Sequence, residues 1–260
     1  MPAQPGQPLS IVILAAGQGK RMKSDLPKVL QPLAGKPLLR HVIDTACTLQ
    51  PVSLHVVYGH GGDVVRGALA DAPVSSWCLQ AEQLGTGHAV QQALPALHDG
   101  ELALILYGDV PLVSADTLRS LVALAGPKTM SLLTVMLEDP TGYGRIVRDA
   151  RGKVRRIVEQ KDATEAERAI REINPSYYCF RTDELLGALA RVGNKNASGE
   201  YYITDVFEIL RKDGRTVAAV DAVPPEDVLS VNGPVQLAEV DAILRKRHAK
   251  VDGSVGGGAR

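Results

Sequence analysis

Three basic residues follow a glycine-rich turn near the beginning of the chain. Lys20, Arg21 and Lys28 lie within a few positions of Gly17 and Gly19. Glycine lets backbone N–H groups approach a ligand closely, and basic side chains neutralise anionic oxygens. The pattern indicates a phosphate-binding loop, and the alternative is an ordinary glycine turn with solvated charges.

Two common phosphate-binding loops do not fit this turn. A dinucleotide-binding fingerprint requires a third glycine, and Met22 occupies that position. A Walker A loop requires Ser or Thr after Gly-Lys, whereas Gly35-Lys36 is followed by Pro37. Both kinds of site are therefore excluded.

Two further motifs have the residue types of a metal site and of a base-recognition site. Asp109 follows the apolar run 102–107 through a glycine, and a carboxylate in such a turn suits Mg²⁺ bound to phosphate oxygens. Gln80 precedes a Gly85-Thr86 turn, and its amide could pair with the imide edge of a pyrimidine. The alternatives are an Asp that accepts from local backbone amides and a helix N-cap at Thr86.

The second half of the chain carries residues that could bind a sugar. Two tyrosines and an acid at positions 200–205 precede an amphipathic helix. They fit either a sugar pocket or core packing with an N-cap. The G-Y-G motif at 142–144 and the E-I-N motif at 172–174 favour the sugar pocket.

The elements that would position these residues alternate between strands and helices. This alternation predicts an α/β fold with a doubly wound, mostly parallel sheet, whose ligands lie beyond the carboxyl ends of the strands. A β-hairpin is expected to turn at residues 149–152. Strands are expected over residues 10–14, 54–58, 77–79 (an edge strand), 102–107, 131–137, 172–180, 216–223 and 227–231. Helices are expected over residues 35–50, 64–70, 89–97, 113–125, 159–171 and 236–250.

Composition excludes several classes of protein. The 29 Lys and Arg equal the 29 Asp and Glu, so no charge favours nucleic acid or an anionic membrane as a partner. Three scattered cysteines argue against a disulfide framework and for a reducing cytoplasm. No apolar run approaches the roughly 20 residues of a membrane span, and the N-terminus is unlike a signal peptide. We expect a cytoplasmic protein.

The motif L-A-A-G-x-G-x-R-M, followed by L-P-K, resembles the sugar-1-phosphate nucleotidyltransferase superfamily. The motif Q-A-E-Q-L-G-T-G-H-A narrows the resemblance to the uridylyltransferase half of the bacterial bifunctional N-acetylglucosamine-1-phosphate uridylyltransferases. The resemblance implies a Rossmann-like, glycosyltransferase-A-like fold with an inserted β-hairpin lobe that binds sugar. It also implies Mg²⁺-dependent transfer of UMP from UTP to N-acetylglucosamine-1-phosphate, which releases pyrophosphate and supplies peptidoglycan and lipopolysaccharide precursors.

The resemblance also assigns residues by their matching motifs. It implies Lys28 and Arg21 as the catalytic cations, and Asp109 and Asn232 as the ligands of Mg²⁺. For the nucleotide it implies Leu14, Ala15, Ala16, Gly17, Lys28, Gln80, Gly85, Thr86, Tyr107, Gly108 and Asp109. For the sugar it implies Gly144, Glu159, Asn174, Tyr202 and Asn232.

The resemblance also divides the chain. It implies a nucleotidyltransferase domain over residues 10–250, with a nucleotide half at 10–138, a sugar-binding lobe at 139–232 and a C-terminal helix at 234–250. Residues 1–9 are expected to be a disordered N-terminus, and residues 251–260 a linker or tail. The hexapeptide repeats of an acetyltransferase β-helix are absent, so we expect no acetyltransferase activity in this chain and a trimer only where such a domain is present.

Two local departures from the family pattern concern the site. The family usually follows its sugar-site Asn with Thr-Gly, and here Asn174 precedes Pro175-Ser176. An Asn/Asp-Arg pair usually follows the metal-site Asn, and here Asn232 precedes Gly233-Pro234.

Two alternative functions stay open. The first is a related transferase, such as one that makes UDP-glucose or a cytidylyl or thymidylyl product, and the second is a catalytically idle nucleotide-binding sensor.

Overall fold

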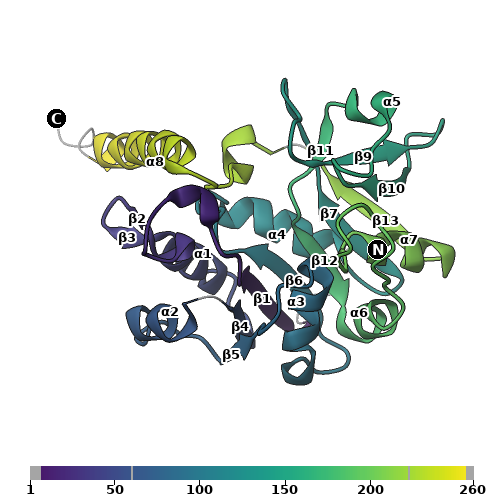
Figure 1. The fold of residues 1–260 in the computed structure, drawn as a ribbon, viewed down its shortest axis with the longest axis horizontal. Coiled ribbons are helices and arrows are strands. Elements are labelled where there is room, and N and C mark those ends of the chain that lie inside the picture. Colours follow the sequence, from purple (N-terminus) through teal and green to yellow (C-terminus); the bar gives the residue numbers. More distant parts are fainter. Residues whose placement is uncertain (1–6, 60, 222, 256–260) are drawn as a thin grey trace.

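A seven-stranded sheet forms the centre of the computed structural model, which describes residues 7–59, 61–221 and 223–255 (Figure 1). Its strand order is β13-β7-β12-β6-β1-β4-β5, and only β12 runs antiparallel to its neighbours. The predicted doubly wound, mostly parallel sheet is confirmed. The strands are β1 (Leu9–Ala15), β4 (Ser53–Tyr58), β5 (Ser76–Leu79), β6 (Leu102–Tyr107), β7 (Thr129–Leu133), β12 (Tyr178–Arg181) and β13 (Thr216–Val220).

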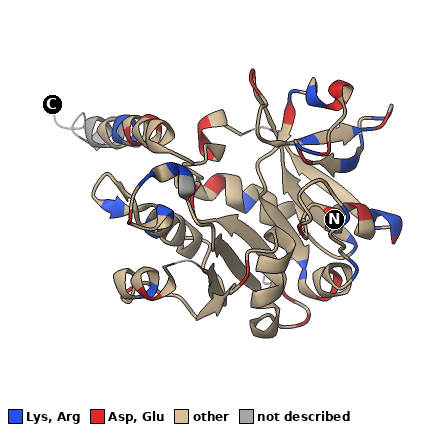
Figure 2. Cartoon of the chain, viewed as in Figure 1, with Lys and Arg blue, Asp and Glu red and all other residues tan. Residues whose placement is uncertain are grey.

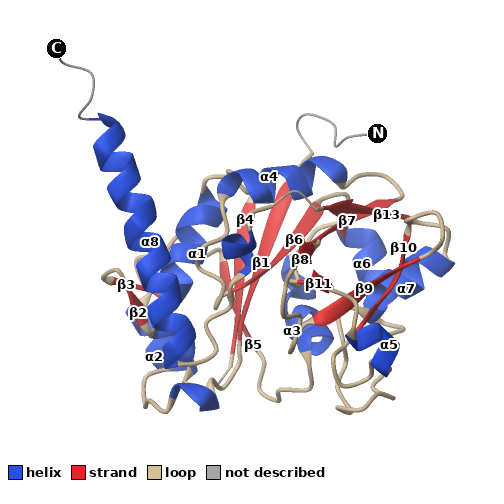
Figure 3. Ribbon diagram, turned by 90° about the horizontal axis from the view of Figure 1, so that it is seen from above, coloured by secondary structure: helices blue, strands red, loops and turns tan. Residues whose placement is uncertain are grey.

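Helices cover both faces of this sheet (Figure 3). Successive side chains of β1 point to opposite faces, so its apolar residues contribute to a core on each side. Ile11 and Ile13 share a core with α1 (Leu38–Cys47), α2 (Gly62–Ala68) and α4 (Ala115–Leu124). Val12 and Leu14 share the other core with helices from both halves of the chain. These helices are α3 (Thr86–Ala93), α6 (Thr182–Leu189) and α7 (Asp205–Lys212).

A second, antiparallel sheet lies beside the carboxyl end of the first (Figure 1). Its strand order is β10-β9-β11-β8, and the expected hairpin is its β9–β10 pair. Its elements are β8 (Val135–Met136), β9 (Gly144–Arg148), β10 (Val154–Val158) and β11 (Glu172–Asn174), and the one-turn helix α5 (Glu165–Arg168) follows β10.

The last helix, α8 (Pro234–Val255), lies outside both sheets beside the small hairpin of β2 (Pro32–Leu33) and β3 (Lys36–Pro37) (Figure 3). Val240 and Leu244 of α8 pack with Met22, Leu112 and Val231 in a third core cluster. Figure 2 shows charged residues mainly on the outer helices and loops, and the central strands almost free of them. No helix in the described part of the chain combines the length and the apolar character needed to cross a bilayer.

Several predicted boundaries are wrong for identifiable reasons. The first helix starts at Leu38 rather than residue 35, because Lys36 and Pro37 pair with β2. The predicted strand 172–180 divides at Pro175, and the predicted strand 131–137 divides at Thr134. No strand forms at 227–231, because residues 227 and 228 end a 3₁₀ helix (Pro225–Val228) and 229–231 are irregular. The helix expected at 159–171 is only α5, and residues 251–255 continue α8. Residues 1–6 and 256–260 lie outside the described residues, and Leu9 already belongs to β1.

Candidate functional site

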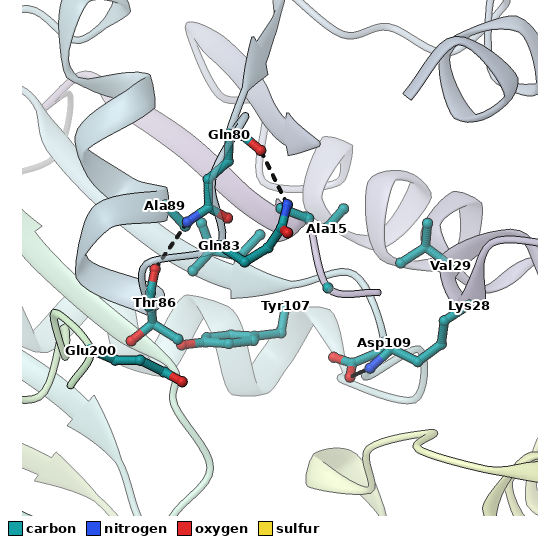
Figure 4. Close-up of a pocket in the computed structure, with 14 residues that line it drawn as sticks. Ala15, Lys28, Val29, Gln80, Gln83, Thr86, Ala89, Tyr107, Asp109 and Glu200 are labelled. Atoms are coloured by element: carbon teal, nitrogen blue, oxygen red, sulfur yellow. Dashed lines mark hydrogen bonds and ion pairs between the residues drawn. The ribbon is translucent and has the colours of Figure 1, made fainter. Parts of the chain in front are cut away.

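A cavity of about 300 Å³ opens where the carboxyl ends of β1, β5 and β6 meet (Figure 4). From β1 the chain builds β4 and β5 on one side and then crosses to β6 on the other, so the cavity lies at the switch point of the sheet. Ten of the predicted nucleotide residues line it: Leu14, Ala15, Ala16, Gly17, Lys28, Gln80, Gly85, Thr86, Tyr107 and Asp109. Gly108 lies just behind it, and its N–H donates to the carbonyl of Leu14 (2.9 Å).

At one end of the cavity, Lys28 contacts two of the predicted site residues. Its Nζ lies 2.5 Å from Oδ2 of Asp109 and 3.5 Å from Oδ1 of Asn232, and the Lys28 and Asp109 side chains are largely buried. A carboxylate oxygen and an amide oxygen thus converge on one cation. Hard oxygen donors of this kind suit a divalent cation, so these two residues fit the predicted Mg²⁺ site.

The glycine turn after β1 brings Lys28 to this position. Gly19 has φ +61°, and a Cβ there would lie 2.5 Å from Cβ of Lys28. Only glycine therefore allows the turn to close against the segment that carries the lysine. Arg21, the other predicted catalytic cation, follows in the same turn but is exposed and does not line the cavity.

The opposite wall of the cavity presents the predicted base-recognition residues. Gln80 is 3 % exposed, and its Nε2 donates to the carbonyl of Gly85 (3.1 Å) and lies 3.1 Å from Nδ1 of His88. These contacts use both N–H groups of the amide, so its Oε1 is the group available to a ligand donor. Gln83 also lines this wall and was not predicted.

A segment from the second half of the chain completes this wall. Gly87 N–H donates to the carbonyl of Tyr201 (2.7 Å), and Tyr201 N–H donates to the carbonyl of Leu84 (2.8 Å). Oγ1 of Thr86 accepts from the N–H of Ile203 (3.1 Å), and Gly85 holds the cap position of α3 instead of Thr86. The segment places Glu200 in the cavity, although its motif was predicted to bind only the sugar.

Three of the predicted sugar residues, Gly144, Glu159 and Asn174, lie in the second sheet or directly after one of its strands, whereas Tyr202 precedes α7 and Asn232 lies beside Lys28. Gly144 and Asn174 are directly paired between β9 and β11. A Cβ on Gly144 would lie 3.5 Å from Oε2 of Glu159 and 3.5 Å from Cβ of Asn174. The structure thus brings three of the predicted sugar residues together at the end of this sheet, and Glu159 accepts a hydrogen bond from Oγ1 of Thr204 (3.1 Å).

Tyr107 connects the two groups of residues. In Figure 4 its hydroxyl points toward Thr86 and Glu200, and Asp109 lies toward the other end of the cavity. Burial raises the pKa of Tyr107, and the nearby carboxylate of Glu159 raises it further. Burial also raises the pKa of Glu159 itself, against the opposing effect of the Thr204 hydroxyl. Both pKa shifts mark a desolvated junction between cavity and second sheet.

Asn174 and Tyr202 are less open than the sequence suggested. The amide of Asn174 is 2 % exposed; its Nδ2 donates to the hydroxyl of Tyr178 (2.7 Å), and its Oδ1 accepts from Ser176 N–H (3.1 Å). The departure at Pro175-Ser176 therefore forms a tight turn that the Asn174 side chain stabilises, with Ser176 at φ +72°. Tyr202 is half-buried, and burial raises its pKa.

The chain is similar in sequence to known nucleotidyltransferase domains over most of its length. Residues 11–193 match the MobA-like NTP transferase domain. The "Bifunctional protein GlmU" of Azoarcus sp. (strain BH72) is 54 % identical over 242 residues, which are 93 % of this chain and 53 % of that protein. The protein of the same name from Paraburkholderia phymatum is 56 % identical over 243 residues, again 93 % of this chain and 53 % of the relative.

These matches define how much of the relatives the chain represents. It spans about half the length of the curated relatives it matches. A solved UDP-glucose pyrophosphorylase, complexed with UDP-glucose, shares the fold with a TM-score of 0.75 at 17 % identity over 92 % of this chain and 99 % of that one. On the match over residues 11–193, the chain belongs to the MobA-like NTP transferase domain family.

Proposed function

We propose that this chain transfers UMP from UTP to N-acetyl-α-D-glucosamine-1-phosphate, which gives UDP-N-acetylglucosamine and pyrophosphate. The observation that carries the proposal is the convergence of Lys28, Asp109 and Asn232 at one end of a cavity whose other wall presents Gln80 and Thr86. The relatives named GlmU support the choice of reaction. The product would supply peptidoglycan and lipopolysaccharide precursors.

The reaction needs charge neutralisation more than a general base. An oxygen of the sugar phosphate attacks the α-phosphorus of UTP, and the bond from that phosphorus to the bridging oxygen of pyrophosphate breaks. The attacking oxygen is already anionic at neutral pH, so no proton has to be removed. Lys28 would neutralise charge on the transferred phosphate, and Arg21 would hold the leaving phosphates. The protein therefore acts mainly by positioning two anions in line.

A divalent cation completes this site. Nucleotidyltransferases of this family generally use a divalent metal, and we propose Mg²⁺ as the ion held by Asp109 and Asn232. It would supply Lewis-acid neutralisation of the phosphate oxygens. Asp109 and Asn232 would supply two of its oxygen ligands, and water and phosphate oxygens usually supply the others when Mg²⁺ binds with a nucleotide.

The remaining residues would divide substrate recognition between the two sheets. Oε1 of Gln80 would accept from the imide N–H of uracil, with Gly85 and Thr86 beside it. Gly144, Glu159, Asn174 and Tyr202 would contact the N-acetylglucosamine unit. The nucleotide half and the sugar lobe would thus be two parts of one domain, which meet at Tyr107.

Pyrophosphate release tests the proposal. We expect release from UTP with N-acetylglucosamine-1-phosphate in Mg²⁺, and none after EDTA. CTP with the same sugar and glucose-1-phosphate with UTP serve as controls. Equal or faster release with either control would contradict the assigned base or sugar pocket. Failure of every pair would contradict the proposed reaction.

A further inference from the structure

A single guanidinium on the last helix contacts both of the segments that carry the proposed metal ligands. Nη1 of Arg247 donates to the carbonyl of Leu112 (2.8 Å), three residues after Asp109. Nη2 of Arg247 donates to Oδ1 of Asp227 (2.9 Å), five residues before Asn232. Arg247 itself does not line the cavity.

The Asp227 carboxylate extends this bridge to α4. It is 1 % exposed, and its Oδ2 accepts from the N–H of Ser114 (3.1 Å) and from Oγ1 of Thr117 (2.8 Å). The carboxylate thus ties the 3₁₀ helix before Asn232 to the loop that leaves Asp109. A buried carboxylate needs both a counter-charge and hydrogen-bond donors, and Arg247 supplies the charge.

Two more contacts hold the same pair of segments. The N–H of Val231 donates to the carbonyl of Asp109 (2.8 Å). Leu112 and Val231 also pack with Val240 and Leu244 of α8 in the third core cluster. The guanidinium, the backbone bond and the apolar packing therefore all restrict movement of the Asp109 loop relative to the Asn232 loop.

We propose that Arg247 is a positioning residue for the metal site: through Leu112 and Asp227 it fixes the separation of Asp109 and Asn232. The inference rests on the proposed function, since it takes these two residues as the metal ligands. Two ligands supplied by different loops bind a cation well only if their spacing is set in advance. Residues that orient metal ligands typically change metal affinity by 10- to 100-fold when they are replaced.

Arg247→Met tests this role, and Arg245→Met is the matched control. Arg245 lies on the same helix and pairs with Asp241, so the control removes the same charge and also breaks an ion pair, but away from both loops. We expect Arg247→Met to weaken Mn²⁺ binding about tenfold, by electron paramagnetic resonance with and without UTP. Arg245→Met should bind Mn²⁺ as the unchanged chain does, and Arg247→Lys should recover part of the affinity.

The dependence of turnover on Mg²⁺ gives a second test, because a general loss of stability would not change this dependence in the same way. The Mg²⁺ concentration for half-maximal turnover should rise about tenfold in Arg247→Met, with maximal turnover restored at high Mg²⁺ and with an unchanged KM for the sugar phosphate. If this variant does not fold, the double change Asp227→Asn and Arg247→Met removes the unpaired buried charge and should show the same shift.

The failure of this inference can be told from failure of the proposed function. Equal Mn²⁺ affinity in Arg247→Met and Arg245→Met would overturn the positioning role, whatever the reaction is. A tenfold loss confined to Arg247→Met would support it even if no tested pair of substrates released pyrophosphate, because Mn²⁺ binding without nucleotide does not depend on the substrates.

Discussion

Lys28 is the residue on which the proposed chemistry depends most directly. Its ammonium contacts Asp109 and Asn232, so it lies where negative charge on the phosphates would collect. Lys28→Ala should lower kcat by at least about 100-fold, the usual effect of removing one preorganised donor to a transition-state anion. Lys36→Ala is the control, because Lys36 pairs with Asp44 on the surface. Unchanged turnover of Lys28→Ala at saturating UTP would contradict the assignment.

The positions of single residues could be predicted where a motif follows a strand of the sheet, while the roles assigned to these residues stay predictions. Lys28 and Asp109 could be placed together because each follows the carboxyl end of a parallel strand, and such ends share one edge. Glu200 and Gln83 were missed in the nucleotide cavity. Glu200 reaches it through the bonds of residues 201–203 to residues 84–87, which are far apart in the chain and which no local pattern encodes.

Glu159 should respond to pH in a way that distinguishes binding from stability. Burial raises its pKa above the ordinary value of 4.5, so its ionised form destabilises the fold at pH values above the raised pKa. This penalty falls as pH drops through the raised pKa toward 4.5, where the unfolded carboxyl also takes up a proton. Glu159→Gln should therefore unfold at a higher temperature than the unchanged chain at pH 8, with a smaller difference at pH 4.5.

Glu167 serves as the control, because its ionisation affects the stability of the fold with the opposite sign. Thr164 backbone and hydroxyl groups lower the pKa of Glu167 in the capping box of α5, so ionised Glu167 contributes stability that is lost as pH falls through its lowered pKa. Glu167→Gln should thus unfold at a lower temperature at pH 8.

The KM of Glu159→Gln for the sugar phosphate should rise about tenfold or more, the effect of one lost charged hydrogen bond. A Glu159→Gln variant with lower stability at pH 8 would contradict the argument.

At the scale of elements, the turn before α3 depends on a glycine that no other residue can replace. Gly85 has φ +113° and ψ 175°, a backbone region that is essentially limited to glycine. A Cβ there would lie 2.6 Å from the carbonyl oxygen of Tyr201 and 2.8 Å from its nitrogen. Since both are backbone atoms, the segment that carries Glu200 would have to move away from the cavity.

Gly85→Ala should therefore weaken UTP binding about tenfold, measured by calorimetry, besides a loss of about 1–3 kcal/mol in the free energy of unfolding. Gly100→Ala separates the two effects. Gly100 also has a positive φ (+85°), but a Cβ there would meet no atom within 4 Å. It should lower stability and leave UTP binding unchanged. Equal UTP affinity in both variants would show that the turn does not shape the base pocket.

Elements were predictable from local pattern only where their periodicity is long enough. The six residues of β6 and the amphipathic α4 were predicted, because each is a continuous apolar or periodic run. A strand was predicted at 227–231, yet residues 227 and 228 end a 3₁₀ helix whose Asp227 contacts α4 and α8. Such tertiary contacts override a weak local preference.

At the scale of the whole molecule, α8 closes a core that the rest of the chain cannot bury alone. Its Val240 and Leu244 cover Leu33, Leu112 and Val231, which come from three distant parts of the sequence. The sequence pattern indicated a helix here but not what it covers. Each fully buried side chain of this kind contributes about 1.5–3 kcal/mol, against a total stability of about 5–15 kcal/mol for a domain. Loss of α8 would thus remove a large fraction of the total.

The expected domain boundary can be tested by truncation. A chain of residues 8–250 keeps the N-terminal pairing of β1, where Leu102 N–H donates to the carbonyl of Pro8, and keeps Arg247. It should unfold within about 3 °C of the full chain and turn over at the same rate. A chain that stops after Gly233 retains Asn232 but neither Val240 nor Arg247, so its third core cluster would face water. We expect it to unfold at least 10 °C lower and to need more Mg²⁺, measured by thermal denaturation and metal titration. If it matched residues 8–250 in both, α8 would be an appendage, and the domain would end at Asn232.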